Sequence, residues 1–224
     1  MIIKSLILLG LIPVLLGVGL RKWFGERVLK RLPLNSTRLT SVEFLERLRK
    51  EAKLAMEVKQ GRRSRLTADT MILSREMAAK DTVIPLAEAG LMFGLALLGR
   101  TQPELLRWRQ WALKFSWAFP AFLILVAIFA AVVGSFVPWI LPAISLGLGI
   151  GTLVSFLVAW IEWQAAGLTA KFLKNRGVVP RDDDRLAIFK AMKALAARRC
   201  VPGMLQMIFP ENKTLMRDTA VDKS

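Results

Sequence analysis

Several residue types that carry chemistry are missing from this chain of 224 residues, which has no histidine, no tyrosine and a single cysteine, Cys200. Without histidine, no imidazole is available to bind a metal ion or to act as a general base. No aromatic stacking platform or glycine-rich recognition motif for RNA is found either. The strongly basic composition therefore does not predict nucleic-acid binding.

Charge is also missing from a long internal stretch, because no Asp, Glu, Lys or Arg occurs between Phe115 and Ile161. A bilayer core of about 30 Å needs about 20 helical residues per crossing, so this stretch predicts two spans joined by a tight turn. We expect the turn around Trp139, between Pro138 and Pro142. With 54% hydrophobic residues and a mean hydropathy of +0.44, the chain is expected to be a mainly α-helical membrane protein.

A second uncharged segment, Ser5 to Leu20, lies near the N-terminus. Its shortness and the preceding Lys4 are also compatible with a cleaved signal peptide. However, it runs directly into Trp23 and a basic cluster, which is typical of an anchor at the membrane interface. We therefore predict an uncleaved transmembrane anchor over residues 1–24, and a two-helix transmembrane hairpin over residues 115–161.

The distribution of Lys and Arg predicts the orientation of these spans. Of the 33 basic residues, one precedes the first span, 20 lie between Arg21 and Lys114, none lies in the hairpin and 12 follow Ile161. Positive loops stay in the cytoplasm, so residues 25–114 and 162–224 are expected on the cytoplasmic face of the membrane. The net charge of +16 makes anionic membrane lipid an expected partner.

The water-exposed parts are expected to be small and rich in helix. "SVEFLERLRKEAKLA", opening at Ser41, predicts an amphipathic helix, and "TMILS", Thr70 to Ser74, predicts a short strand. A further helix is expected over residues 81–99, capped by Asp81 or Thr82. Residues 162–224 are expected to form a cytoplasmic helix, "PRDDDRLAIFKAMKALAARR", followed by a loose tail after Pro202.

The helix over residues 81–99 is ambiguous, because Glu88 is the only charge between Thr82 and Gly99. As a membrane span it would bury a carboxylate at a cost of at least about 2.5 kcal/mol. As a packed helix outside the membrane it would place Glu88 among small residues that allow close approach of another element. Both interpretations remain open from the sequence.

The remaining notable patterns have structural explanations. "RWRQW", with Trp108 and Trp111, is typical of an aromatic and basic belt at a membrane interface. Three glycines spaced by two, Gly147, Gly149 and Gly151, lie inside an apolar span and favour close helix packing rather than nucleotide binding.

Taken in order, several segments resemble the bacterial membrane family of neutral zinc metallopeptidases. "RLTSVEFLERL" is similar to the opening of a helix in that family, and Leu73-Ser74 to the end of its short strand. "LAEAGLMFG" is similar to its active-site helix, which carries His-Glu-x-Gly-His. "RWRQWALKFSWAFPAF" is similar to the segment leading into its membrane hairpin, and "WIEWQAAGLTAKFLKNRGVV" to the segment after it, which begins Val-Glu-Phe. The resemblance extends over residues 1–200 and implies a peptidase-like region at residues 25–114.

The resemblance also assigns roles to residues. It places Glu88 at the general base and Gly90 at the motif glycine, whereas Ala87 and Leu91 replace the two histidines. Glu162 takes the place of the third zinc ligand and is expected to approach Glu88. In the family motif, histidines at i and i+4 share one helical face and hold one zinc ion, and Ala and Leu cannot do so. We therefore expect no metal and no cofactor.

Cys200 matches no ligand position of the family, so it is expected to be a buried or reduced cytosolic thiol.

Three functions remain in competition. The first is a catalytically inactive relative that binds a protein partner, as a homo- or hetero-oligomer, at the cytoplasmic membrane face. The second is an active membrane metallopeptidase that uses Glu88 with a non-standard zinc site. The third is a structural protein of the membrane surface.

Overall fold

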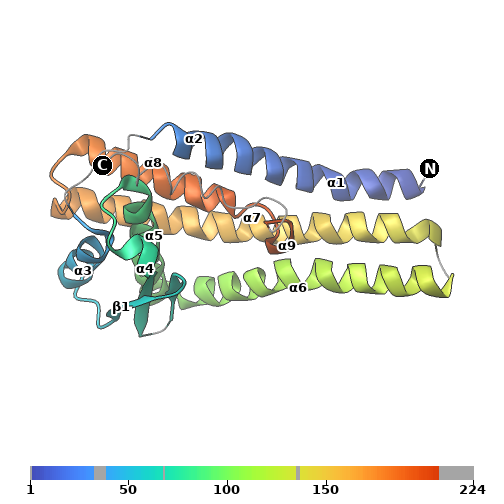
Figure 1. Ribbon diagram of the computed structural model, residues 1–224, viewed down its shortest axis with the longest axis horizontal. Coiled ribbons are helices and arrows are strands. Elements are labelled where there is room, and N and C mark those ends of the chain that lie inside the picture. Colours follow the sequence, from blue (N-terminus) through green and yellow to red (C-terminus); the bar gives the residue numbers. More distant parts are fainter. Residues whose placement is uncertain (1, 33–38, 68, 135–136, 207–224) are drawn as a thin grey trace, which may run out of the picture. The chain divides into compact units, whose positions relative to one another are not determined.

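The computed structural model describes residues 2–32, 39–67, 69–134 and 137–206, which form two compact units (Figure 1). The first unit contains the described residues up to Phe24, Arg107–Trp160 and those from Ala197 onward. Its elements are α1 (Ile2–Leu20), most of the π-helix η1 (Arg21–Glu26), most of α6 (Pro103–Val133), the first part of α7 (Val137–Arg176) and the short helix α9 (Gly203–Gln206).

The second unit contains Gly25–Leu106 and Ile161–Ala196, as far as these residues are described. It combines short helices with a small sheet and with the ends of two long helices. Its elements are α2 (Arg27–Lys30), α3 (Ser41–Glu51), β1 (Glu57–Gly61), β2 (Arg65–Leu66), β3 (Thr70–Ser74), α4 (Arg75–Ala78), α5 (Val83–Thr101), the last part of α7 and most of α8 (Asp182–Arg198).

Long apolar helices dominate the chain, as expected for an α-helical membrane protein. Four stretches of the described residues are long and apolar enough to cross a membrane, namely Ile2–Lys30, Val83–Thr101, Pro103–Val133 and Pro138–Arg176. Large apolar side chains of α6 are exposed, with Phe129 at 69% and Val132 at 81%. Such a surface is unfavourable in water and suits contact with lipid.

The helix α5 differs from the other three in being enclosed by protein. In its most apolar stretch 72% of the residues are buried within the molecule, compared with 11% for Ile2–Lys30, 17% for Pro103–Val133 and 50% for Pro138–Arg176. Of the two interpretations left open by the sequence, this burial favours a helix packed inside the second unit.

In the first unit, α1 packs against α7 through small residues. The Ser145 hydroxyl donates a hydrogen bond to the Ile7 carbonyl at 2.9 Å. A Cβ added at Gly149 would lie 2.7 Å from the Gly10 carbonyl oxygen, and one at Gly17 would lie 2.8 Å from the Thr152 side chain. Contacts advance in the same direction along both helices, so α1 and α7 are parallel. The absence of side chains lets the two backbones approach closely.

The two other glycines of the span contact α6, as expected for close packing of the hairpin. A Cβ at Gly147 would clash with Leu123, and one at Gly151 would lie 2.9 Å from Pro120. Here the contacts advance in opposite directions, so α6 and α7 form an antiparallel hairpin (Figure 1).

The hairpin turn lies earlier than the prolines suggested. The chain leaves α6 at Gly134, whose φ of +72° is accessible to glycine. The helix α7 begins at Val137, so Pro138 lies in its first turn and Pro142 lies inside it. The prediction of a turn at both prolines is therefore wrong, because Pro138 is tolerated among the first helical residues, whose N–H groups have no helical acceptor.

The second unit has a three-stranded sheet in the order β1-β3-β2. β1 is parallel to the central strand β3, with Glu57 opposite Thr70, and β2 is antiparallel to it, with Leu66 opposite Met71. The core beneath it collects apolar residues of α3, β3, α5 and α8, of which the largest are Phe44, Leu45, Leu48, Met71, Leu73, Leu86, Phe93, Ile188 and Met192.

Local sequence signals explain several of these elements. The helix α3 begins with a capping box, in which the Thr40 hydroxyl accepts the Glu43 N–H at 3.3 Å and the Glu43 carboxylate accepts the Thr40 N–H at 3.0 Å. The predicted strand at Thr70–Ser74 is confirmed, as is the helix start after Thr82. β1 and β2 were not predicted, since "EVKQG" and "RL" show no apolar alternation.

The C-terminal region divides between the two units. The predicted helix after the aspartates is confirmed as α8, and it packs with the second unit up to Ala196. From Ala197 the chain packs instead with the long helices of the first unit. The tail after Pro202 is expected to be loose, but its first four residues form the helix α9 (Gly203–Gln206), and residues 207–224 lie outside the described residues.

Candidate functional site

The helix α5 carries the residues that the resemblance assigned to an active site. Ala87 is fully buried and Leu91 is 5% exposed, and both belong to the apolar core. Glu88 between them is half-buried. The replaced histidine positions are therefore filled by apolar side chains that pack the core of the second unit.

Two glycines on α5 let this helix pack closely against α7. The Thr169 hydroxyl donates to the Gly90 carbonyl at 2.8 Å and also to the Ala165 carbonyl of its own helix at 3.1 Å. A Cβ at Gly94 would clash with the backbone of Ala165. Because Gly90 lies at the level of Thr169 and Gly94 at that of Ala165, α5 and α7 run antiparallel here.

This packing fixes the level of the second carboxylate. Continuing the register, Glu88 lies level with Lys171, and Glu162 lies level with Leu97. At 1.5 Å per helical residue the two carboxylates are offset by about 13 Å along the helix pair. Glu162 is completely buried. The structure therefore does not bring Glu88 and Glu162 together at one point.

The described residues contain no cluster of potential metal ligands. Within 2–32, 39–67, 69–134 and 137–206, no group of three or more His, Cys, Asp or Glu side chains converges on a point that could hold a metal ion. Cys200 is buried in the first unit, at 2% exposure, whereas Glu88 and Glu162 belong to the second.

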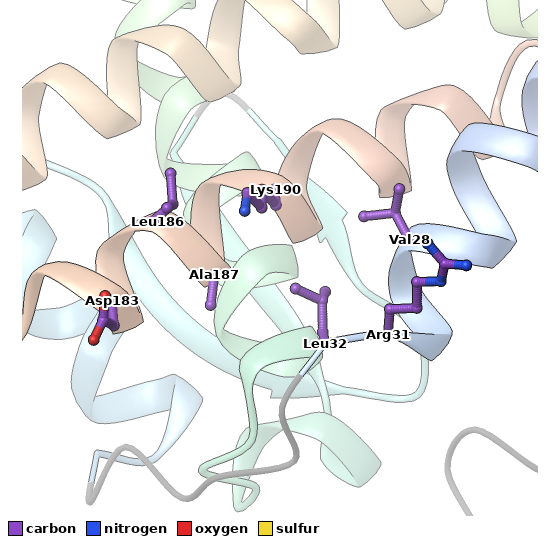
Figure 2. Close-up of a pocket in the computed structure, with 7 residues that line it drawn as sticks. All are labelled: Val28, Arg31, Leu32, Asp183, Leu186, Ala187 and Lys190. Atoms are coloured by element: carbon purple, nitrogen blue, oxygen red, sulfur yellow. The ribbon is translucent and has the colours of Figure 1, made fainter.

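A groove on the second unit lies between the end of α2 and the helix α8. It has a volume of about 480 Å³. Figure 2 shows α8 contributing four side chains and the α2 side contributing three. Its apolar lining is Val28, Leu32, Leu186 and Ala187, and its charged lining is Arg31, Asp183 and Lys190.

Two surface carboxylates of the same unit have perturbed acidity. Hydrogen bonding from the Thr40 backbone, and then from its hydroxyl, holds the pKa of Glu43 below its usual value. The hydrogen bond and charge of Lys59, whose ammonium lies 2.7 Å from the carboxylate, lower the pKa of Glu57. Both carboxylates are solvated, and their interactions stabilise the local structure of α3 and β1.

The sequence did not reveal the groove. Leu186 is a large apolar residue that is 50% exposed. Nothing in local periodicity indicates that α2, more than 150 residues earlier in the chain, lies across from it. The only available signal was Leu186 itself, an apolar residue beside Arg185 and the aspartates.

Comparison of the chain with protein-family models, with characterised proteins and with solved structures finds no match.

Proposed function

We propose that this chain is a membrane protein with a metallopeptidase-like scaffold that acts by binding a protein partner and not by hydrolysis. The observation that carries the proposal is the packing of Ala87 and Leu91 into the apolar core. A catalytic zinc needs about three protein ligands, usually with nitrogen or sulfur among them. Two hydrocarbon side chains at the ligand positions supply none.

The helix packing supports this proposal in a second way. The pattern His-Glu-x-Gly-His can also be aligned with α5 one turn later, over Leu91–Leu95, where Gly94 takes the place of the glycine and is the only match; we call the two alignments the earlier and the later frame. In this later frame Leu95 lies within about 3 Å of the level of Glu162, the position similar to the third zinc ligand. The later frame is therefore the one that brings a motif position close to the level of the third ligand.

The two frames differ in the base they retain. In the earlier frame Glu88 remains at the general-base position. In the later frame Met92 stands there, so neither the two nitrogen ligands nor the base survive. The offset between Glu88 and Glu162 favours the later frame, and Glu88 then has no catalytic ancestry to explain it. Both frames lead to a protein that binds without cleaving.

We place the second unit on the cytoplasmic face of the inner membrane. The support is the count of basic residues on either side of the apolar segments, with none in the hairpin between Phe115 and Ile161. Anionic headgroups then attract the juxtamembrane cations of η1 and α2. The groove between α2 and α8, which both apolar and charged side chains line, is where we place the protein partner.

Metal content and hydrolysis test the absence of catalysis. We expect full-length protein purified in detergent to contain far less than one zinc per chain and to cleave no membrane or soluble peptide substrate. Glu88→Gln should behave as wild type in both assays. Stoichiometric zinc together with proteolysis abolished by Glu88→Gln overturns the proposal.

A photo-crosslinking amino acid tests the binding part. Placed at Leu186 in native membranes, it should give an adduct of one defined mass, a second copy or another protein. The same probe at Lys53, which is exposed on the same unit, should not. Equal adduct patterns at both positions contradict a partner in the groove. If the protein contains no zinc and gives no adduct, the proposal fails in favour of a structural protein of the membrane surface.

A further inference from the structure

A short segment after α8 is buried among the long helices of the first unit. Cys200 is 2% exposed, Val201 1%, and Pro202 is buried as well. The two preceding residues are Arg198 and Arg199, and no charged residue follows until Glu211. An uncharged stretch thus begins where the chain rejoins the first unit.

This segment contacts all three long helices of that unit. A Cβ on Gly17 of α1 would lie 2.8 Å from the Cys200 carbonyl oxygen. A Cβ on Gly151 of α7 would lie 3.7 Å from the Pro202 ring. A Cβ on Gly203 would lie 3.3 Å from the indole of Trp117, on α6. Four consecutive residues therefore fill the space where α1, α6 and α7 meet.

The contacts also give the depth of the segment. Gly151 lies inside the charge-free stretch of α6 and α7, about 15 Å before its end at Ile161. Gly17 lies inside the apolar part of α1, about one turn before Arg21. Both positions are within the layer that these helices would span in a bilayer. Non-helical backbone is tolerated at such a depth only where protein encloses it, and the burial of Cys200–Pro202 meets that condition.

We propose that Cys200–Gly203 is a plug, which enters the membrane layer from the face bearing Arg198 and Arg199 and fills the space between α1, α6 and α7. The plug acts as a latch, a segment that can be displaced, and is not a fixed span. It is short, and Pro202, which has no N–H, interrupts the helical structure between α8 and α9. Gly17, Gly151 and Thr152 border the space that the plug fills, and the two glycines have no side chain with which to fill it when the plug withdraws.

The rate at which the single cysteine, Cys200, reacts with a maleimide measures whether the plug is buried. Full-length protein in opened native membranes is treated with a membrane-impermeant maleimide. An accessible thiol outside the groove, Lys50→Cys in a Cys200→Ser background, gives the reference rate. We expect wild-type Cys200 to react at least ten times more slowly than this reference. Equal rates mean that the segment lies in water, and the proposal fails.

Displacement of the plug is tested with a matched pair on α1. Gly17→Leu puts a side chain where the Cys200 carbonyl lies, and should raise the labelling rate of Cys200 at least ten-fold. Gly19→Leu is the control, since nothing lies within 4 Å of a Cβ at Gly19, and it should leave the rate unchanged.

A second variant tests the same displacement in case Gly17→Leu misfolds. Trp117→Ala removes the contact with Gly203 without overpacking, and should also raise the rate, with far-UV circular dichroism unchanged. If neither Gly17→Leu nor Trp117→Ala changes the rate, the segment is a fixed part of the bundle and no latch exists. If Gly19→Leu raises it as much as Gly17→Leu, the contact at Gly17 does not hold the plug.

Discussion

The hydroxyl of Thr169 donates a hydrogen bond to the main-chain carbonyl of Gly90 at 2.8 Å. Gly90 has no side chain to shield its main-chain carbonyl, so this oxygen can accept a second hydrogen bond from outside its own helix. The bond from Thr169 joins α5 to α7 across a buried interface. It also sets the axial register of the two helices. That register determines which part of α5 faces Glu162.

Three glycine-to-alanine substitutions are predicted to differ by what a new Cβ meets. Gly94→Ala directs it into the Ala165 backbone, which cannot move without displacing α7, and should destabilise the protein by about 1–3 kcal/mol. Gly90→Ala meets the Met192 sulfur at 2.9 Å, the flexible end of a side chain, and should cost less. Thermal unfolding in detergent, followed by far-UV circular dichroism, measures the series.

Gly167→Ala is the control for this series, because nothing lies within 4 Å of its Cβ position on α7. There the better helix propensity of alanine should stabilise the protein by up to about 1 kcal/mol. If Gly94→Ala is as stable as Gly167→Ala, α5 and α7 do not approach as closely as their glycines indicate.

Zinc binding restored by mutation is predicted to distinguish the two frames of the degenerate motif. Leu91→His/Met92→Glu/Leu95→His puts the nearer of its two imidazoles, at position 95, within about 3 Å of the level of Glu162 and should bind about one zinc per chain. Ala87→His/Leu91→His shifts the imidazole pair one turn away from Glu162 and should bind much less. Metal content after dialysis, measured on monodisperse protein, gives the ratio.

The control for this experiment is Glu162→Gln added to the triple variant, which should lower the zinc content at least ten-fold by removing the third ligand. Zinc retained by Ala87→His/Leu91→His but not by the triple variant would show that the earlier frame, with Glu88 as the base, is the correct one.

Elements with a local cause were predictable from the sequence. Thr40 and Glu43 indicate the start of α3, and the strand-favouring residues Thr70–Ser74 predict β3. Asp182 marks the first residue of α8. The capping side chains and the strand residues act within a few positions of themselves, so no knowledge of the rest of the chain is needed.

Features that depend on distant residues were not predictable. Helical periodicity tells which face of α5 is buried but not how far α5 slides along α7, so the approach of Glu162 to Glu88 was expected and the offset was not. β1 exists because β3 pairs with it and not because of its own residues. The transfer of the chain from one unit to the other at Ala197 has no local signal at all.

The packing of α1 on α7 predicts that the N-terminal helix is a permanent part of the first unit. Gly10→Val places a branched side chain against the backbone of Ser145 and should separate the helices, with a cost of about 1–3 kcal/mol. Gly19→Val, in open space on the same helix, should be nearly neutral. The readout is the rate of proteolysis in mild detergent. Equal rates for both variants would mean that α1 is not held at Gly10.

The capping box of α3 predicts a pH-dependent contribution to stability. The pKa of Glu43 is lowered in the folded chain by hydrogen bonds from Thr40. A lowered carboxylate pKa adds stability above the unfolded value, and this stability is lost as the pH falls through the folded value. Glu43→Gln should therefore be less stable than wild type at neutral pH, and the difference should shrink as the pH falls below the usual 4.5.

Unfolding midpoints of wild type and Glu43→Gln over a series of pH values measure this difference. Thr40→Ala, which removes the other half of the box, should cost about 1 kcal/mol at neutral pH. Glu46→Gln, on the same helix but outside the box, serves as the control. A difference between wild type and Glu43→Gln that stays constant down to acid pH would mean that the ionised carboxylate does not cap α3, since a neutral acceptor would then serve equally well at every pH.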